Sequence, residues 1–130
     1  MPYTTPPSAD DIADLAEQAL ADLPDALRHH VSGVAIMVED AADDETLRAL
    51  GLDNPWDLTG LYQGVPLHLR EQTEVRHAPD RILLFRDAIL LEWIEEGEDL
   101  RALVRNVLVH EIAHHFGFSD DDIARLEEEG

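Results

Sequence analysis

The stretch LRALVRNVLVHEIAHHFGFSD (residues 100–120) joins an apolar helical pattern to a cluster of histidine and acidic side chains. Val104 and Val107 lie on one face of the helix that this spacing predicts. Continued by threes and fours, the same face reaches Glu111 and His114, so polar residues prolong the side that should point inward. A buried charge is costly unless it is paired or bound to a metal. The stretch therefore predicts a helix whose last turns need a cation, a hydrogen-bond network or a cleft.

Two histidines of this stretch have the spacing of metal ligands. His110 and His114 are four positions apart, so their imidazoles lie on one helix face and can converge on one cation. Glu111 completes the pattern H-E-x-x-H, in which the glutamate acts as a base on water. Gly117 can adopt a positive φ, end the helix and let the chain bring Asp120 back as a third ligand. Two histidines, a carboxylate and water would make an open zinc site with one ion per chain.

Some assignments within the cluster stay open on sequence alone. Asp121 or Asp122 could replace Asp120 as the third ligand, although both suit the first turn of a following helix. His115 lies about 100° around the helix from its neighbour, which favours a packing or supporting role over metal binding. The competing interpretation of the whole cluster is a polar helix end that binds no metal.

The composition narrows the class of partner. The chain carries 9 Lys+Arg against 29 Asp+Glu, a net charge of −20, and contains no lysine. This charge argues against binding to nucleic acid or to an anionic membrane, because both need a positive field. No cysteine is present, and no apolar run has the length of a membrane span or the form of a signal peptide. We therefore expect a cytoplasmic protein whose acidic surface attracts metal ions and basic partners.

The length of 130 residues suits one domain, which we place at residues 9–130 after a flexible tail at 1–8. Helices and a few strands follow one another without βαβ regularity, which predicts an α+β fold. The expected elements are a helix over 9–29 that Pro24 could divide, a buried strand over 33–40, a helix over 43–52, a hairpin or two strand fragments over 61–69, a strand over 81–85, a helix over 86–96, a helix from 98 or 99 to about 116, and a last helix from 119.

Two segments outside the cluster could serve the site. Tyr62 and Arg81 could stabilise an oxyanion if they face the metal, although structural roles are the simpler interpretation. The strand RILLF (81–85) could offer an edge to which an extended peptide adds by backbone pairing, or it could be an ordinary buried strand. The remaining histidines show no ligand spacing; they are His29, His30, His68 and His77.

The segment HEIAHHFGFSDDDI (110–123) is similar to the H-E-x-x-H-x-x-G-x-x-D segment of the minimal-zincin family of small bacterial metallopeptidases. GLYQGVPL (60–67) and PDRILLFRDAIL (79–90) resemble the other two recurring segments of that family. Together the three segments cover most of residues 55–125. The longer motif also resembles that of the metzincins, but those enzymes place a methionine turn after it. Here no methionine follows the motif, which favours the shorter family.

The resemblance implies a compact zincin-like α+β fold, with a small sheet packed against an N-terminal helix and an active-site helix. It implies zinc held by His110, His114 and Asp120, with Glu111 as the catalytic base. The expected function is hydrolysis of an unidentified peptide or protein by a zinc metallopeptidase. The alternative is a non-catalytic acidic module that binds a peptide and holds a structural or vestigial zinc. A weaker hypothesis treats the charge as a nucleic-acid mimic directed at a basic protein.

Overall fold

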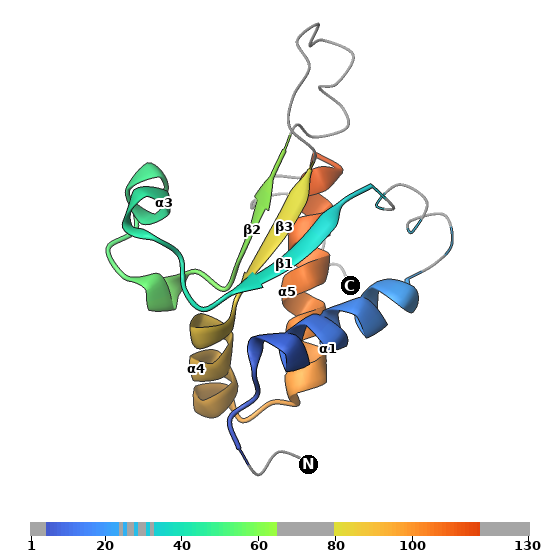
Figure 1. The fold of residues 1–130 in the computed structure, drawn as a ribbon, viewed down its shortest axis with the longest axis horizontal. Helices are drawn as coiled ribbons and strands as arrows, with labels where there is room; N and C mark the ends of the chain where they lie inside the picture. The colour runs from blue at the N-terminus through green and yellow to red at the C-terminus, as the bar shows by residue number, and fades with distance from the viewer. Residues whose placement is uncertain are drawn as a thin grey trace, which may run out of the picture.

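The computed structural model describes residues 5–23, 25, 28, 31, 33–64 and 80–117. Within this part of the chain, helices surround one small sheet (Figure 1), so the fold is α+β, as predicted. The elements are α1 (Ala9–Ala21), β1 (Ala35–Glu39), α3 (Asp44–Ala49), the short 3-10 helix η1 (Pro55–Asp57), β2 (Gly60–Gln63), β3 (Arg81–Phe85), α4 (Arg86–Glu96) and α5 (Leu100–His115).

The three strands form a mixed sheet in the order β1-β3-β2. β1 is parallel to β3, from Ala35 opposite Arg81 to Glu39 opposite Phe85, whereas β2 is antiparallel to β3. β3 takes the centre because its sequence is apolar after the first residue and is buried on both faces. The prediction that β3 could offer an edge to a peptide is therefore wrong, and its alternative, an ordinary buried strand, is confirmed.

β1 also differs from its prediction. Its residues alternate between exposed and half-buried, and Met37 at its middle is 44% exposed. An apolar, β-branched run looks the same in an edge strand as in a central one, because sequence alone does not show how many neighbours the strand has. The strand is where we expected it, but it is not buried.

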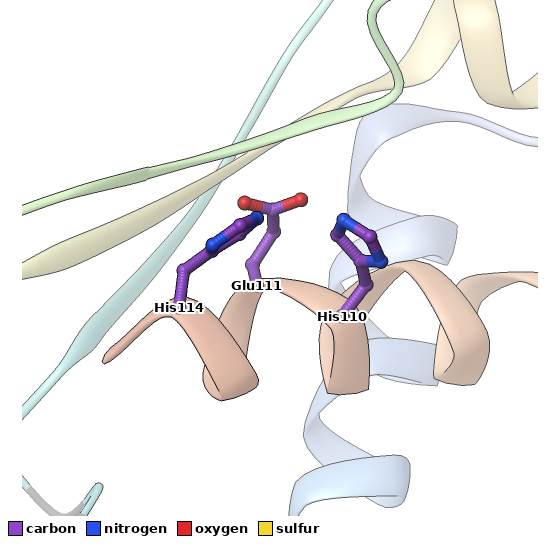
Figure 2. A group of neighbouring side chains, drawn as sticks. All are labelled: His110, Glu111 and His114. Atoms are coloured by element: carbon purple, nitrogen blue, oxygen red, sulfur yellow. The ribbon is translucent and has the colours of Figure 1, made fainter. Parts of the chain in front are cut away.

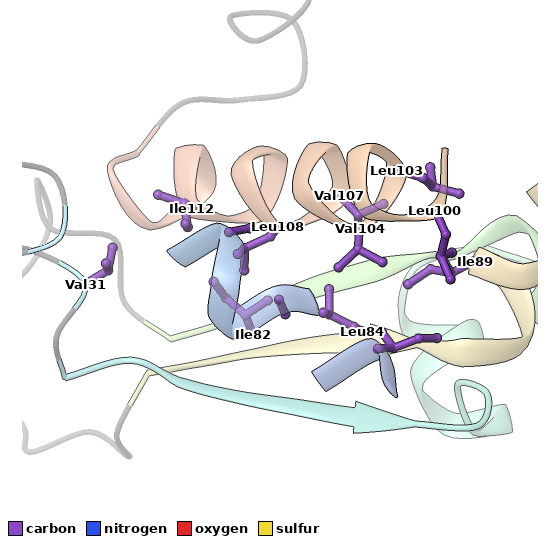
Figure 3. Close-up of a cluster of buried hydrophobic side chains, with 13 residues drawn as sticks. Val31, Ile82, Leu84, Ile89, Leu100, Leu103, Val104, Val107, Leu108 and Ile112 are labelled. Atoms are coloured by element: carbon purple, nitrogen blue, oxygen red, sulfur yellow. The ribbon is translucent and has the colours of Figure 1, made fainter. Parts of the chain in front are cut away.

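The main hydrophobic core lies between one face of the sheet and the helices α1 and α5 (Figure 3). Alternate residues of β3 point to opposite faces, so Ile82 and Leu84 enter this core while Leu83 and Phe85 enter a second, smaller cluster. The second cluster includes Leu47 of α3. Full burial of each such side chain stabilises the fold by roughly 1.5–3 kcal/mol.

α1 begins as predicted and ends earlier. Ser8 caps it: its hydroxyl accepts from the backbone N–H of Asp11 at 3.1 Å, while the Asp11 carboxylate accepts from Ser8 N at 2.8 Å. The helix ends at Ala21 rather than at residue 29, and helical conformation returns at residues 25, 28 and 31. The stretch is thus divided, as the proline in it suggested. Pro7 is already buried, and its carbonyl accepts from Arg86 Nε at 2.7 Å.

The connection from α4 to α5 places the long helix against the sheet. α4 ends at Gly97, whose φ of 67° is favourable for glycine, and Asp99 caps α5 by accepting from Ala102 N at 3.1 Å. α5 then runs behind the sheet, where it packs on α1 and β2 (Figure 1). Among the described residues, no helix is both long and apolar enough to cross a membrane.

Candidate metal centre and its cleft

α5 buries one continuous face along its whole length. The apolar part of this face includes Val104, Val107 and Leu108, and beyond them Glu111 and His115 are buried. The sequence predicted that the face would reach Glu111, which is confirmed. It also placed His114 on this face. His114 is only half-buried, however. The buried face of α5 continues from Glu111 to the residue one turn, or four positions, further on, which is His115.

His110, Glu111 and His114 project from α5 on the side of the strands (Figure 2). One ligand atom from each lies within 4.8 Å of the others, and the two imidazole rings are 5.0 Å apart between centroids at 77°. Zinc bonds to nitrogen at about 2.0–2.1 Å, so two nitrogens sharing an ion lie at most about 4 Å apart. The ligand atoms are therefore within about 1 Å of the separation that a shared ion requires. The donor set of imidazole and carboxylate therefore fits zinc.

These side chains line a cleft of about 840 Å³ between α5, β2 and the chain from α3 to β2. Successive turns of α5 from Leu103 to His114 line it, which corresponds to about 16 Å of helix at 1.5 Å per residue, and Gly117 lines it beyond the end of the helix. Apolar and acidic side chains form the rest of the lining. The apolar ones come from β2 and the chain that precedes it; they are Leu50, Leu52, Leu58 and Leu61. The acidic ones come from that chain, from α4 and from the turn after α4; they are Asp57, Glu92 and Glu98.

Glu111 is oriented by the neighbouring strand. It is 7% exposed, and its Oε1 accepts a hydrogen bond from the backbone N–H of Tyr62 at 2.9 Å. The strand can approach this closely because residue 60 is glycine: a Cβ there would lie 2.8 Å from Val107 Cγ1 and 3.2 Å from Glu111 Cγ. Sequence reasoning missed this contact, because only the fold brings β2 beside α5.

The sequence model of the zincin-like metallopeptidase family matches residues 31–129, which is most of the chain. The chain belongs to the zincin-like metallopeptidase family. The match includes the whole of β1, β2, β3, α4 and α5, and with them His110, Glu111 and His114. Membership indicates a metal-dependent hydrolase and zinc as its metal. A comparison with characterised proteins finds no match to this chain.

Next to the candidate metal residues, the chain has a second group of polar side chains. His115 is 1% exposed, and its Nδ1 lies 3.3 Å from the Tyr62 hydroxyl and 3.4 Å from Asp80 Oδ2. The supporting role expected for His115 is therefore what the fold gives it. Asp80 is also buried, and sequence reasoning missed it because it lies far from His115 along the chain.

The structure gives Tyr62 and Arg81 different surroundings. Tyr62 lines the cleft, but its N–H contacts Glu111 and its hydroxyl contacts His115. Arg81 is exposed and donates from Nε to Gln63 Oε1 at 2.6 Å. Arg81 is not among the residues that line the cleft, which agrees with the structural role expected of it.

The end of α5 follows the prediction as far as the structure describes it. The helix stops at His115, and Gly117 has a φ of 97° while its N–H donates to the His114 carbonyl at 2.9 Å. Asp120 and its alternatives, Asp121 and Asp122, lie outside the described residues, as do the four histidines without ligand spacing. Asp120 as third ligand stays a prediction.

The acidic end of the cleft is electrostatically unlike its metal end. The pKa of Glu92 is raised above its usual value, first by burial and then by the like charges of Glu98, Glu96 and Glu95. Glu98 lies just before α5, so this carboxylate cluster is at the opposite end of the helix from His114. The cleft therefore joins a candidate cation site to a region of negative potential.

Proposed function

We propose that this chain is a zinc-dependent peptidase in which Glu111 is the general base. The observation that carries the proposal is the position of the Glu111 carboxylate, which stands beside His110 and His114 (Figure 2). These side chains line an open cleft, and Tyr62 N–H donates to one carboxylate oxygen. A structural zinc site has no use for such a base and usually fills all four positions with protein ligands. The arrangement therefore favours catalysis over a purely structural metal.

The residues that would hold zinc are His110 and His114, together with Asp120 as the expected third ligand. When bound, zinc supplies Lewis acidity at the scissile carbonyl and makes water more acidic near neutral pH. Glu111 accepts a proton from the attacking water as the oxygen adds to the carbonyl carbon. Glu111 then donates this proton to the amine as the carbon–nitrogen bond breaks, so the carboxylate is regenerated and water is consumed.

The shape of the cleft supports an extended peptide as substrate. It follows α5 for several turns, and on its other side runs β2, which among the described strands pairs only with β3. The Thr59 carbonyl accepts a hydrogen bond from Phe85 N at 2.9 Å. In an antiparallel pair only every second residue bonds to the partner strand, so the backbone N–H and C=O groups of Gly60 and Tyr62 point away from β3. A peptide lying in the cleft would meet that edge.

Replacement of Glu111 by glutamine tests the proposal. Glu111→Gln keeps the size of the side chain and an acceptor for Tyr62 N–H but removes the base. We expect about one zinc per chain in both proteins by elemental analysis, and loss of cleavage of a mixed peptide library by about 100-fold or more in the variant.

Glu17→Gln, an exposed change on α1, is the matched control and should cleave as the wild type does. Equal cleavage by the Glu111 variant would show that the base is elsewhere. Zinc binding with no cleavage of any library member by the wild type would favour the non-catalytic binding module instead.

A further inference from the structure

Two buried polar residues near Glu111 need an explanation beyond stability. Asp80 and His115 are 5% and 1% exposed, and with Glu111 they are the charged or polar residues found buried in the described part of the chain. Burying such groups costs free energy unless they are hydrogen-bonded, and apolar residues of the same size would often be at least as stable. Their presence at the end of the core therefore suggests that they fix a geometry.

The group ties three elements together at one point. Asp80 immediately precedes β3, Tyr62 belongs to β2 and His115 is the last residue of α5. His115 Nδ1 contacts both the Tyr62 hydroxyl and Asp80 Oδ2, and the Asp80 carbonyl accepts from Ala35 N of β1 at 3.1 Å. The sheet and the C-terminal end of α5 are thus joined through one buried imidazole.

Gly64 shows how tightly this point is packed. A Cβ on Gly64 would lie 2.1 Å from Asp80 Oδ1 and 2.8 Å from the Tyr62 hydroxyl, distances that real side chains do not occupy. The Asp80 carboxylate and the Tyr62 hydroxyl therefore meet the same glycine. The polar groups have little room to move to other positions.

Tyr62 links this buried point to Glu111. Its hydroxyl contacts His115, and its backbone N–H donates to Glu111 Oε1 at 2.9 Å. Glu111 and His115 are four residues apart on α5, so they lie on one face of the helix, one turn apart. Tyr62 bridges that turn, since its backbone N–H contacts Glu111 and its side-chain hydroxyl contacts His115.

We propose that Asp80, His115 and Tyr62 form a positioning clamp that sets the orientation of the Glu111 carboxylate. The clamp holds β2 at a fixed distance from α5, so the hydrogen bond from Tyr62 N–H to Oε1 keeps the carboxylate in one orientation. A general base works only when its carboxylate lies within hydrogen-bond reach of the proton it removes. This inference rests on the proposed function of Glu111, and the three clamp residues act through Glu111 rather than on the substrate.

The first test measures the link without any substrate. Amide hydrogen exchange of position 62 is followed by NMR in the full chain and in the variants Tyr62→Phe and Asp80→Asn. We expect exchange at position 62 to quicken by about tenfold or more in both variants, because the strand is freed from α5. The Phe85 amide, which donates to the Thr59 carbonyl in the same strand pair, should keep its rate.

Asp53→Asn is the matched control, since Asp53 is exposed and takes no part in the clamp. Unchanged exchange at position 62 in both clamp variants would overturn the proposal. Equal acceleration at positions 62 and 85 would overturn it as well, because that result shows only a general loss of stability.

The second test separates positioning from binding once a cleaved peptide is known. In both clamp variants we expect kcat to fall by about tenfold while KM stays within about twofold and zinc content is unchanged. A matching rise in KM with constant kcat would contradict the clamp. If Glu111→Gln retains full cleavage, the proposed function fails, whereas the exchange result still decides whether the clamp holds β2.

Discussion

The two halves of α5 bury the same helix face with opposite chemistry. Up to Leu108 the buried side chains are apolar and lie in the main core. Further along, Ile112 still belongs to that core, but Glu111 and His115 are polar and contact Tyr62 and Asp80 (Figure 3 shows the apolar side chains). The first half is stabilised by surface removed from water, the second by specific partners. Changes in the first half should therefore cost stability, and changes near the second should cost metal binding and chemistry.

The largest expected effect concerns zinc and His114. Metal that binds only the folded chain stabilises it by about 4 kcal/mol at a free concentration of about 1,000 times its Kd. We expect zinc to raise the unfolding midpoint of the wild type and to have no such effect on His114→Ala. In the metal-free state the variant should unfold near the wild type, because His114 is only half-buried. The measurement is chemical denaturation with zinc and with chelator.

Asn106→Ala is the control for that experiment, since Asn106 lines the same cleft one turn before His110. It should keep the full response to zinc. A response of equal size in His114→Ala would remove this residue from the predicted ligands and would break the contrast between the halves of α5.

The next effect belongs to the apolar half. Leu108 is fully buried, so Leu108→Ala should lower the free energy of unfolding of the metal-free chain by about 3 kcal/mol through lost burial and a new cavity. Zinc should still bind to the fraction that folds. Val109→Ala, the neighbouring residue with 41% exposure, serves as control and should change stability by less than about 1 kcal/mol. A similar loss in both variants would mean that the buried face is placed wrongly.

Gly60→Ala acts between the two halves. The added Cβ would meet Val107 on the apolar side and Glu111 on the polar side, so β2 must move away from α5. We expect a loss of about 1–3 kcal/mol in stability, as in overpacked cores, together with faster exchange of the Tyr62 amide. Gly33→Ala is the control, because a Cβ there meets nothing within 4 Å. If both variants behave alike, close approach at Gly60 is not what orients Glu111.

The sequence predicted the buried face of α5 and the candidate metal residues, but not the contacts that orient them. Helix periodicity identified the buried face as far as Glu111, and the spacing of His110 and His114 identified the candidate metal residues. These signals are local, because an α-helix brings together residues three and four apart. The same local rule assigned His114 to the buried face, where the structure has His115.

The contacts that orient the site were not predictable in this way. Asp80 and Tyr62 meet His115 only because β3 is central and β2 lies beside α5, and sheet order is set by the packing of the whole chain. The apolar runs of β1 and β3 look alike in sequence, yet among the described strands β1 is an edge and β3 is the centre. The role of Gly60 follows from the same arrangement.

The smallest expected effect tests the acidic end of the cleft, where Glu92 lies among like charges. Its pKa is raised by burial and then by Glu98, Glu96 and Glu95, so its ionisation opposes folding. The stability that comes with its protonated form is complete below the usual pKa of 4.5 and is lost as pH rises through the raised pKa. Glu92→Gln should therefore be more stable than the wild type near neutral pH.

The difference should stay below about 0.5 kcal/mol, because solvent still reaches and screens this partly buried carboxylate, and it should vanish at acidic pH. Urea denaturation of the metal-free proteins at both pH values measures it, with Glu17→Gln on α1 as control. A variant that is less stable than the wild type near neutral pH would show that Glu92 has a stabilising partner. The acidic end would then resemble Glu111, whose carboxylate is held by a donor, and the contrast between the two ends of the cleft would disappear.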